Sequence, residues 1–418
     1  MIEIAGMSVK ELADTYQTPL MVYDENKLRQ KMSDFMHYFQ SDTFETGVLY
    51  ASKAFSCKEI LRLANEYRMC LDVVSGGELY TAGQVNFPME RVYFHGNNKS
   101  LAEMKMAIEY GVGTIIVDNL QEAQVFNELA KNSDHVIHIL LRINPGIDAH
   151  THKYIVTGHV DSKFGVSMLQ EEEIVRVIKT FDENEHTVFE GFHAHIGSQI
   201  FDKNAFAAEI KKMFGFVKKM EEDHGIVLNT VNLGGGFAAT YTDADAPIPL
   251  PEVCATILDT AKAQQDERQT HVKKLLIEPG RSIVAEAGST IYTAGFTKQT
   301  PNKNYVFVDG GMADNIRPAL YQAAYDADVA NKDDQPKTVT YTIAGKCCES
   351  GDLLIEGIKL PPCQAGDLII VYTTGAYGYS MASHYNKLPL PAVVFVKDGK
   401  ARVVIERESY EHMIALEK

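Results

Sequence analysis

The sequence lacks the features that place a protein in a membrane or on a nucleic acid. No stretch approaches the ~18 apolar residues of a membrane-spanning helix. The amino terminus, residues 1–6, lacks the basic and then apolar segments of a secretion signal, so we expect a cytoplasmic protein. The formal net charge is −16, with no basic stripe. Such a charge repels nucleic acids and anionic membranes, so we expect neither as a partner.

Cysteine is also scarce, with six residues in a chain of 418. Their positions match neither a metal-ligand spacing nor a disulfide framework, so we expect reduced thiols and no metal site. The adjacent pair Cys347 and Cys348 would form a strained ring if bridged. Low-complexity linkers are absent too.

The length and the spacing of β-branched runs predict a barrel followed by a second domain. A chain of 418 residues exceeds the roughly 250 residues of one TIM barrel, which indicates two domains. Segments with helical periodicity lie between the short apolar runs, as the crossovers of a parallel sheet require. The eight runs of this (β/α)8 TIM barrel are Val48–Ser52, Leu71–Ser75, Arg91–Phe94, Thr114–Val117, His138–Ile143, Val188–His193, Thr230–Leu233 and Lys274–Ile277.

After about residue 285 successive strand-like runs replace the alternation, so we expect a mostly β domain. These runs are Ile291–Phe296, Tyr305–Val308, Val339–Ile343, Leu353–Ile358, Leu368–Tyr372, Val393–Val396 and Ala401–Ile405. Asp398-Gly399 between the last two is a hairpin turn signal. The run Leu20–Tyr23 is strand-like and precedes the barrel, so it is expected to join the β domain. The expected domains are therefore 25–285 for the barrel, and 1–24 with 286–418 for the β-rich domain.

Polar or glycine residues follow each barrel run and are expected to meet at one face, because the active sites of such barrels lie at the carboxyl ends of the strands. Lys53 follows the first run. A lysine desolvated at the rim of an apolar barrel loses part of its preference for the charged state, so its amine becomes a nucleophile toward a carbonyl. The carbonyl that we expect is that of pyridoxal phosphate.

Other residues at these strand ends suit the same cofactor. Gly234–Gly236 and Gly280-Arg281-Ser282 follow the last two runs and could supply a phosphate site, although a glycine triplet alone is also a common tight turn. Glu278 could keep a pyridine nitrogen protonated, or else form a structural salt bridge with Arg281. His195 could stack on a planar ring, or be held by ordinary hydrogen bonds.

Many motifs in one order resemble the fold-type III pyridoxal-phosphate-dependent amino-acid decarboxylases, and within them the diaminopimelate decarboxylase family, over nearly the full length. They are Tyr50-Ala51-Ser52-Lys53-Ala54, Asp72-Val73-Val74-Ser75-Gly76-Gly77-Glu78-Leu79, His95-Gly96-Asn97-Asn98-Lys99, residues 144–152, Lys163-Phe164-Gly165, His195-Ile196-Gly197-Ser198-Gln199, Glu278-Pro279-Gly280-Arg281, Cys348-Glu349-Ser350-Gly351-Asp352 and Tyr377-Gly378.

The resemblance implies a role for each matching residue. Lys53 is the Schiff-base lysine, His195 stacks on the cofactor ring and Glu278 faces the pyridine nitrogen. Cys348 is the proton donor and Glu349 binds the distal ammonium of the substrate, both across the interface of a homodimer. The remaining cofactor residues are Asp72, Ser198, Gly235, Gly236, Gly280, Arg281 and Tyr377.

The resemblance also implies a substrate, meso-2,6-diaminopimelate, which would give L-lysine and CO2. Arg281 and Arg317 match positions that hold the distal carboxylate, with Tyr321 assisting, and guanidinium binds carboxylate in a bidentate fork. Tyr377 contacts the substrate too. Ornithine or lysine has only an amine at the far end and would leave the two arginines uncompensated.

Alternatives share parts of this pattern. A lysine or ornithine decarboxylase of the same fold would not need Arg317, and alanine racemase usually places an arginine where Glu278 stands. A non-catalytic pyridoxal-phosphate carrier would lack the Cys348-Glu349 pair, and a Schiff-base aldolase would need no phosphate site. Lys346-Cys347 departs from the family, which more often has proline and an apolar residue there. This departure leaves two candidate thiols, of which the Cys-Glu-Ser order favours Cys348.

Overall fold

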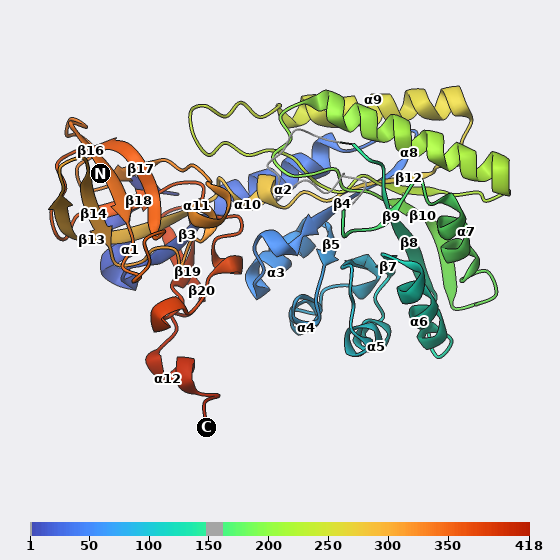
Figure 1. Cartoon of the computed structure of the whole chain (residues 1–418), viewed down its shortest axis with the longest axis horizontal. Coiled ribbons are helices and arrows are strands. Elements are labelled where there is room, and N and C mark those ends of the chain that lie inside the picture. The colour runs from blue at the N-terminus through green and yellow to red at the C-terminus, as the bar shows by residue number, and fades with distance from the viewer. Residues whose placement is uncertain (1, 148–161) are drawn as a thin grey trace. The chain divides into compact units, whose positions relative to one another are not determined.

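The computed structural model describes residues 2–147 and 162–418, and these fall into two compact units (Figure 1). The first comprises Met1–Lys31, Ala239–Ala246 and Arg281–Lys418, and the second comprises Met32–Ala238 and Pro247–Gly280. The expected boundaries at residues 24/25 and 285/286 stay a prediction. The sequence motif over 144–152 lies partly outside the described residues. None of the helices in the described part of the chain has the length and apolar character needed to cross a bilayer.

The second unit is the expected TIM barrel. Eight parallel strands pair in sequence order, and the last of them pairs with the first, which closes the sheet. The strands are β4 (Glu45–Ala51), β5 (Cys70–Val73), β6 (Val92–Phe94), β7 (Thr114–Val117), β8 (Ile137–Asn144), β10 (Thr187–His193), β11 (Thr230–Asn232) and β12 (Lys274–Ile277). The two-residue strand β9 (Val166–Ser167) pairs with β8. Each of the eight barrel strands overlaps a run that the sequence predicts, and β7 and β12 match their runs at both ends.

Apolar side chains fill the barrel and bury its strands. A buried cluster joins side chains of β4, β6, β7, β8 and β12, namely Leu49, Tyr93, Ile116, Leu140 and Leu276. Helices occupy the crossovers, as Figure 1 shows for α4, α5 and α6 outside strands β5 to β8. They are α3 (Lys58–Glu66), α4 (Gly76–Gln84), α5 (Leu101–Tyr110), α6 (Leu120–Ala130), α7 (Glu171–Lys179), α8 (Lys203–His224) and α9 (Leu250–Arg268). The helix α2 (Glu25–Tyr38) precedes the first barrel strand, β4.

The first unit is mostly β-sheet, as expected. Its main sheet runs in the order β17-β16-β14-β13-β3-β19-β20, and β18 joins β13 to β15. The strands are β3 (Leu20–Asp24), β13 (Gly288–Gln299), β14 (Asn304–Val308), β15 (Ala327–Val329), β16 (Val339–Ala344), β17 (Leu353–Leu360), β18 (Leu368–Val371), β19 (Ala392–Lys397) and β20 (Lys400–Ile405). The sequence misses β15, which has three residues, and the two-residue strands β1 (Glu3–Ile4) and β2 (Met7–Ser8).

Short helices complete this unit, namely α1 (Val9–Tyr16), α10 (Arg281–Val284), α11 (Arg317–Tyr321) and α12 (Tyr410–Ile414). Two local expectations are confirmed here. The strand β3 from the start of the chain pairs antiparallel with β13 and parallel with β19, so it belongs to the β sheet. Asp398 and Gly399 have φ of +50° and +73° and join β19 to β20 in a tight hairpin, because both residue types tolerate positive φ.

One buried carboxyl in the barrel unit is a liability to stability. Glu209 on α8 is 0 % exposed, and neither of its carboxyl oxygens has a hydrogen-bond partner in the described part of the chain. Burial raises the pKa of Glu209 well above its usual value. A buried carboxyl without partners is costly, and the cost grows if the group ionises.

We therefore expect Glu209→Met to stabilise the protein, by about 1–3 kcal/mol at pH 8. Because the folded-state pKa lies above the unfolded-state value, the wild type loses stability as pH rises from about 4.5 toward the raised pKa. The gain in thermal midpoint should therefore be larger at pH 8 than at pH 4. The exposed Glu222, on the same helix, provides the control Glu222→Met, for which no gain is expected. A Glu209→Met protein that is less stable at pH 8 would contradict this account.

Candidate active site

The strand-end lysine lies in a tight turn. Lys53 follows β4 in a 3₁₀ turn, Ser52–Ala54, which the hydroxyl of Tyr50 stabilises by donating to the carbonyl of Phe55 at 2.6 Å. The Lys53 side chain is exposed, whereas the sequence analysis expects a desolvated lysine. The expectation of burial by the barrel itself is therefore wrong.

Glu278 lies just beyond β12 and is buried, with 5 % of its side chain exposed. His193 Nε2 is hydrogen-bonded to its Oε2 at 3.1 Å, and Asn232 Nδ2 donates to its Oε1 at 2.8 Å. His95 Nε2 lies 3.0 Å from Oε1. Burial opposes the negative charge, but the two histidines and their contacts outweigh it and lower the pKa of Glu278 well below its usual range. Both oxygens are thus engaged by barrel side chains.

Asp72 on β5 is the second buried carboxyl of this cluster, with 2 % exposure. Its Oδ1 lies 3.7 Å from His95 Nε2 and accepts no hydrogen bond in the described residues. Burial raises the pKa of Asp72. His95, His193 and Glu278 lie close enough together to hold a metal ion. The contacts that the two histidines make with the Glu278 carboxylate explain their closeness without a metal.

His195 lies two residues beyond the end of β10, after the run Val188–His193 that the sequence predicts. The N–H of Gly235 donates to its Nδ1 at 3.2 Å. Burial lowers the pKa of His195 well below its usual value, and the nearby charge of Lys53 adds to this effect. The ring is therefore neutral at pH 7. Ser198 lies further along the same loop and is partly buried.

The glycines after β11 and β12 are required by close packing. A Cβ on Gly235 would lie 2.4 Å from the carbonyl oxygen of Glu278, and one on Gly280 would lie 2.9 Å from the Cβ of Ala51. Gly236 has φ of +107°, which disfavours other residues. Close backbone approach is thus established for these glycines, whereas their contact with a phosphate stays a prediction.

In the β-rich unit two buried arginines lie within a set of tyrosines. Arg281 Nη1 donates to the hydroxyl of Tyr241 at 2.6 Å, and Arg317 Nη1 donates to the hydroxyl of Tyr325 at 2.7 Å. The rings of Tyr241 and Tyr325 meet edge to face, with centroids 5.4 Å apart. Arg317 is 7 % exposed, and its Nε has no hydrogen-bond partner among the described residues. Tyrosines therefore orient this cation without neutralising it.

The other expected residues of this set lie around the same arginines. The guanidinium carbon of Arg281 is 4.8 Å from the ring centroid of Tyr377, and that of Arg317 is 6.0 Å from the ring centroid of Tyr321. Sequence reasoning misses Tyr241 and Tyr325. Tyr241 lies only five residues beyond the glycine triplet, which is the one signal that could have found it, whereas Tyr325 is recognisable only by its contact.

The two adjacent cysteines differ in their surroundings. Cys347 is buried, and burial near the Asp352 carboxyl raises its pKa to about 11. Cys348 is exposed, and its N–H donates to Asn386 Oδ1 at 2.7 Å. Asp352 accepts the N–H of Cys347 at 2.7 Å, which fixes the turn. Glu349 is exposed beside Cys348. The structure therefore presents the Cys348 thiol, and all six cysteines are free, as expected.

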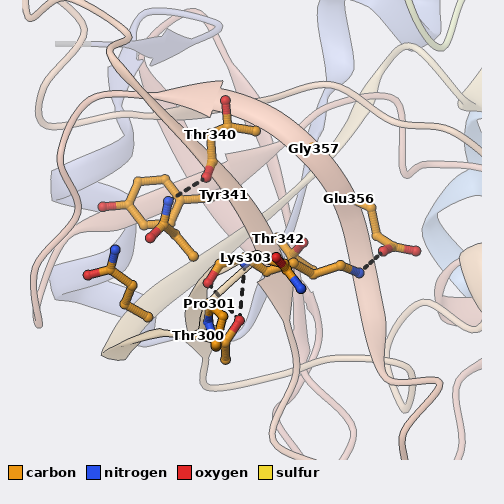
Figure 2. Close-up of a pocket in the computed structure, with 11 residues that line it drawn as sticks. Thr300, Pro301, Lys303, Thr340, Tyr341, Thr342, Glu356 and Gly357 are labelled. Atoms are coloured by element: carbon orange, nitrogen blue, oxygen red, sulfur yellow. Dashed lines mark hydrogen bonds and ion pairs between the residues drawn. The ribbon is translucent and has the colours of Figure 1, made fainter.

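A hollow elsewhere in the β-rich unit has no such chemistry. Figure 2 shows it between the turn at Thr300–Lys303 and the strands β16 and β17, with Glu356 and Gly357 at its edge. Its volume is about 520 Å³. Lys303 Nζ is paired with Glu356 at 2.7 Å, and both side chains are about half exposed. Because this exposed pair already satisfies its charges, the hollow is a weaker candidate than the buried clusters.

Comparisons with known proteins identify the family of the chain. The family described as pyridoxal-dependent decarboxylase, pyridoxal binding domain, matches residues 25–285. The diaminopimelate decarboxylase of Bacillus subtilis is 47% identical, over 100% of this chain and 95% of the relative. That of Staphylococcus aureus is 41% identical, over 98% and 96%.

Solved structures give the same result. The diaminopimelate decarboxylase of M. jannaschii, solved in complex with L-lysine, has a TM-score of 0.90 at 33% identity, and the match covers 98% of this chain and 94% of that one. A lysine/ornithine decarboxylase of Vibrio vulnificus reaches 0.78 at 22% identity, over 94% and 99%, which shows a shared fold alone. The resemblance expected from the sequence motifs is confirmed, and the chain belongs to the pyridoxal-dependent decarboxylases, in the diaminopimelate decarboxylase family.

Proposed function

We propose that this chain decarboxylates meso-2,6-diaminopimelate to L-lysine and CO2, with pyridoxal phosphate as cofactor. The observation that carries the substrate assignment is the pair of buried arginines in the tyrosine set. Arg317 has tyrosine neighbours, and its Nε has no hydrogen-bond partner in residues 2–147 and 162–418. Arg281 donates a hydrogen bond to Tyr241, and both guanidinium groups suit the carboxylate of a bound molecule. Ornithine and lysine have no carboxylate at the distal end.

The barrel cluster fits pyridoxal phosphate. A pyridine nitrogen stays protonated beside a carboxylate that is itself ionised, and Glu278 is buried, hydrogen-bonded and held as an anion. His195 is neutral and offers a ring face, and Lys53 is the lysine that would bond covalently to the cofactor. We assign contacts around the phosphate and its neighbourhood to Ser198, Gly235, Gly236, Gly280 and Arg281. The N–H of Gly235 already donates to His195, so Gly235 would contribute to the phosphate site by allowing close packing of the backbone.

The residues then divide the reaction among them. When bound, pyridoxal phosphate accepts the electron pair that departing CO2 leaves behind. Glu278 holds a proton at the pyridine nitrogen, and Asp72 lies in the same buried cluster. Cys348 donates a proton to the carbon that has lost CO2. Its neighbour Cys347 is buried with a raised pKa, which supports the assignment to Cys348.

The substrate contacts follow from the two charges at its distal end. Arg281 and Arg317 bind the distal carboxylate, with Tyr321 and Tyr377 beside them. Glu349 binds the distal ammonium. We further propose a cytoplasmic homodimer in which Cys348 and Glu349 serve the active site of the other subunit. The exposure of both residues supports this arrangement.

The test is to supply purified protein with pyridoxal phosphate and meso-diaminopimelate, and to measure lysine and CO2. We expect the two products in equal amounts. A change in cofactor absorbance without release of CO2 would indicate a carrier protein instead, and no change at all would contradict the cofactor assignment.

A further inference from the structure

The barrel cluster contains two buried carboxyls, and its hydrogen bonds favour one of them. Glu278 accepts bonds from His193 and Asn232, and its Oε1 lies 3.0 Å from His95 Nε2. Asp72 Oδ1 lies farther from the same nitrogen, at 3.7 Å, and accepts no hydrogen bond in the described residues. Burial raises the pKa of Asp72 although the charges of His95 and Lys53 oppose this. Two carboxylates in one dry cluster resist ionising together, because burial and like charge both oppose it. The donors therefore decide which carboxyl carries the charge.

The two donors are held in place by the barrel. Asn232 Oδ1 accepts the N–H of Gly234 at 2.9 Å, which fixes the orientation of the amide and points its Nδ2 at Glu278. His193 is 1 % exposed, and its ring packs edge to face on His95 with centroids 4.8 Å apart. Both donors lie on the ends of adjacent strands, β10 and β11. Strand-borne groups of this kind keep their geometry when a ligand binds.

The charge state of His193 makes it a suitable hydrogen-bond donor to the Glu278 carboxylate. Burial lowers the pKa of His193 to about 4, so the ring is neutral at pH 7 and donates through Nε2–H. Its Nδ1 has no hydrogen-bond partner in the described part of the chain. A neutral donor stabilises an anion without cancelling its charge, whereas an arginine in this place would compensate the carboxylate and weaken its effect on a third group.

We propose that His193 and Asn232 are positioning residues that select Glu278, and not Asp72, as the ionised carboxyl and aim it at the pyridine nitrogen of the cofactor. This inference rests on the proposed cofactor site. It assigns the protonation state of the bound cofactor to two residues that need not touch the substrate.

The test compares His193→Leu, which removes the donor, with His193→Gln, which places an amide N–H near the position of Nε2. Two measurements apply to the cofactor-bound protein, namely the affinity for pyridoxal phosphate and the ¹⁵N chemical shift of cofactor labelled at the pyridine nitrogen. We expect His193→Leu to bind about 10- to 100-fold more weakly. Its ¹⁵N shift should move toward that of the unprotonated ring, and His193→Gln should restore both values.

The barrel offers a matched control. His138 Nδ1, near the amino end of β8, lies 2.8 Å from Oε1 of Glu190, in the middle of β10. His138→Leu therefore removes a second histidine–glutamate contact from the same sheet. Both cofactor measurements should stay unchanged in this variant.

Asn232→Leu tests the second donor independently and decides the question if His193→Leu does not fold. The proposal is overturned if a folded His193→Leu or Asn232→Leu protein keeps wild-type affinity and a protonated ¹⁵N shift. A wild-type protein that does not bind pyridoxal phosphate would instead overturn the proposed function, and this inference with it.

Discussion

Lys53→Ala should reduce the rate of lysine formation by about 10³-fold or more, since the loss of a residue that forms a covalent intermediate is among the largest single effects in an enzyme. Lys53 lies in the turn after β4, and its side chain is exposed. The barrel fold does not depend on it, so the variant should fold and melt as the wild type does. The rate of lysine formation at saturating substrate measures this effect.

Borohydride reduction provides an independent measurement, because it fixes the cofactor to the lysine that holds it. Peptide mass analysis should find the label on Lys53 in the wild type and no label on the variant. Lys58 lies one turn further along the chain at the start of α3 and is exposed, so Lys58→Ala is the matched control with an unchanged rate. A label on another lysine, or a Lys53→Ala protein with more than about a tenth of the wild-type rate, would contradict the assignment.

Arg317→Met should lower kcat/KM for diaminopimelate by about 10²- to 10³-fold, the usual effect of removing one partner of a buried charged pair. Cofactor affinity should not change, because the arginine is assigned to the substrate alone. Arg317→Lys keeps the charge but loses the planar guanidinium fork, so its kcat/KM should lie between those of the wild type and Arg317→Met. Tyr325→Phe removes the hydrogen bond at 2.7 Å and should cost roughly tenfold or less, mainly in KM.

Steady-state kinetics with diaminopimelate and with lysine separate this role from a structural one. Loss of the carboxylate site should lower the preference for diaminopimelate, whereas general misfolding should lower both rates together. Arg62 on α3 is exposed and provides the control Arg62→Met. An Arg317→Met protein that keeps its preference would contradict the role given to the arginine.

Most of the fold is predictable from the sequence, because parallel strands are buried on both faces and appear as short apolar runs. The strands β7 and β12 begin and end at the residues that the runs predict. Strand β15 is missed because it has only three residues, Ala327–Val329, too few for their alternation to be distinguished from chance. Its pairing with β18 comes from tertiary contact.

The candidate site is predictable only in part. Residues directly after strands, such as Lys53 and Glu278, are found from topology, since a closed parallel barrel brings these ends to one face. His193 and His195 are two residues apart, and this spacing indicates side chains on the same side of an extended chain. Of these two histidines, only His195 is predicted from the sequence to be a site residue. Tyr325 cannot be found in this way, because its role depends on one contact with Arg317.

Lys53 is exposed and not desolvated, but it lies just after the first barrel strand, as predicted. An apolar strand predicts a buried lysine only if the strand continues to it, and β4 ends two residues earlier at Ala51. The reactivity of the lysine then depends on the groups around it. The charge of Lys53 adds to burial in lowering the pKa of His195, and it opposes the rise that burial causes in the pKa values of Asp72 and Glu78.

The most direct test of the central claim is the specificity constant, kcat/KM, measured for meso-diaminopimelate, lysine and ornithine with saturating pyridoxal phosphate. If the buried arginines bind a distal carboxylate, diaminopimelate should be preferred over either alternative by about 100-fold or more, with one lysine formed per CO2. Equal or faster turnover of ornithine or lysine would contradict the account, because neither substrate has a carboxylate for Arg281 and Arg317 to bind.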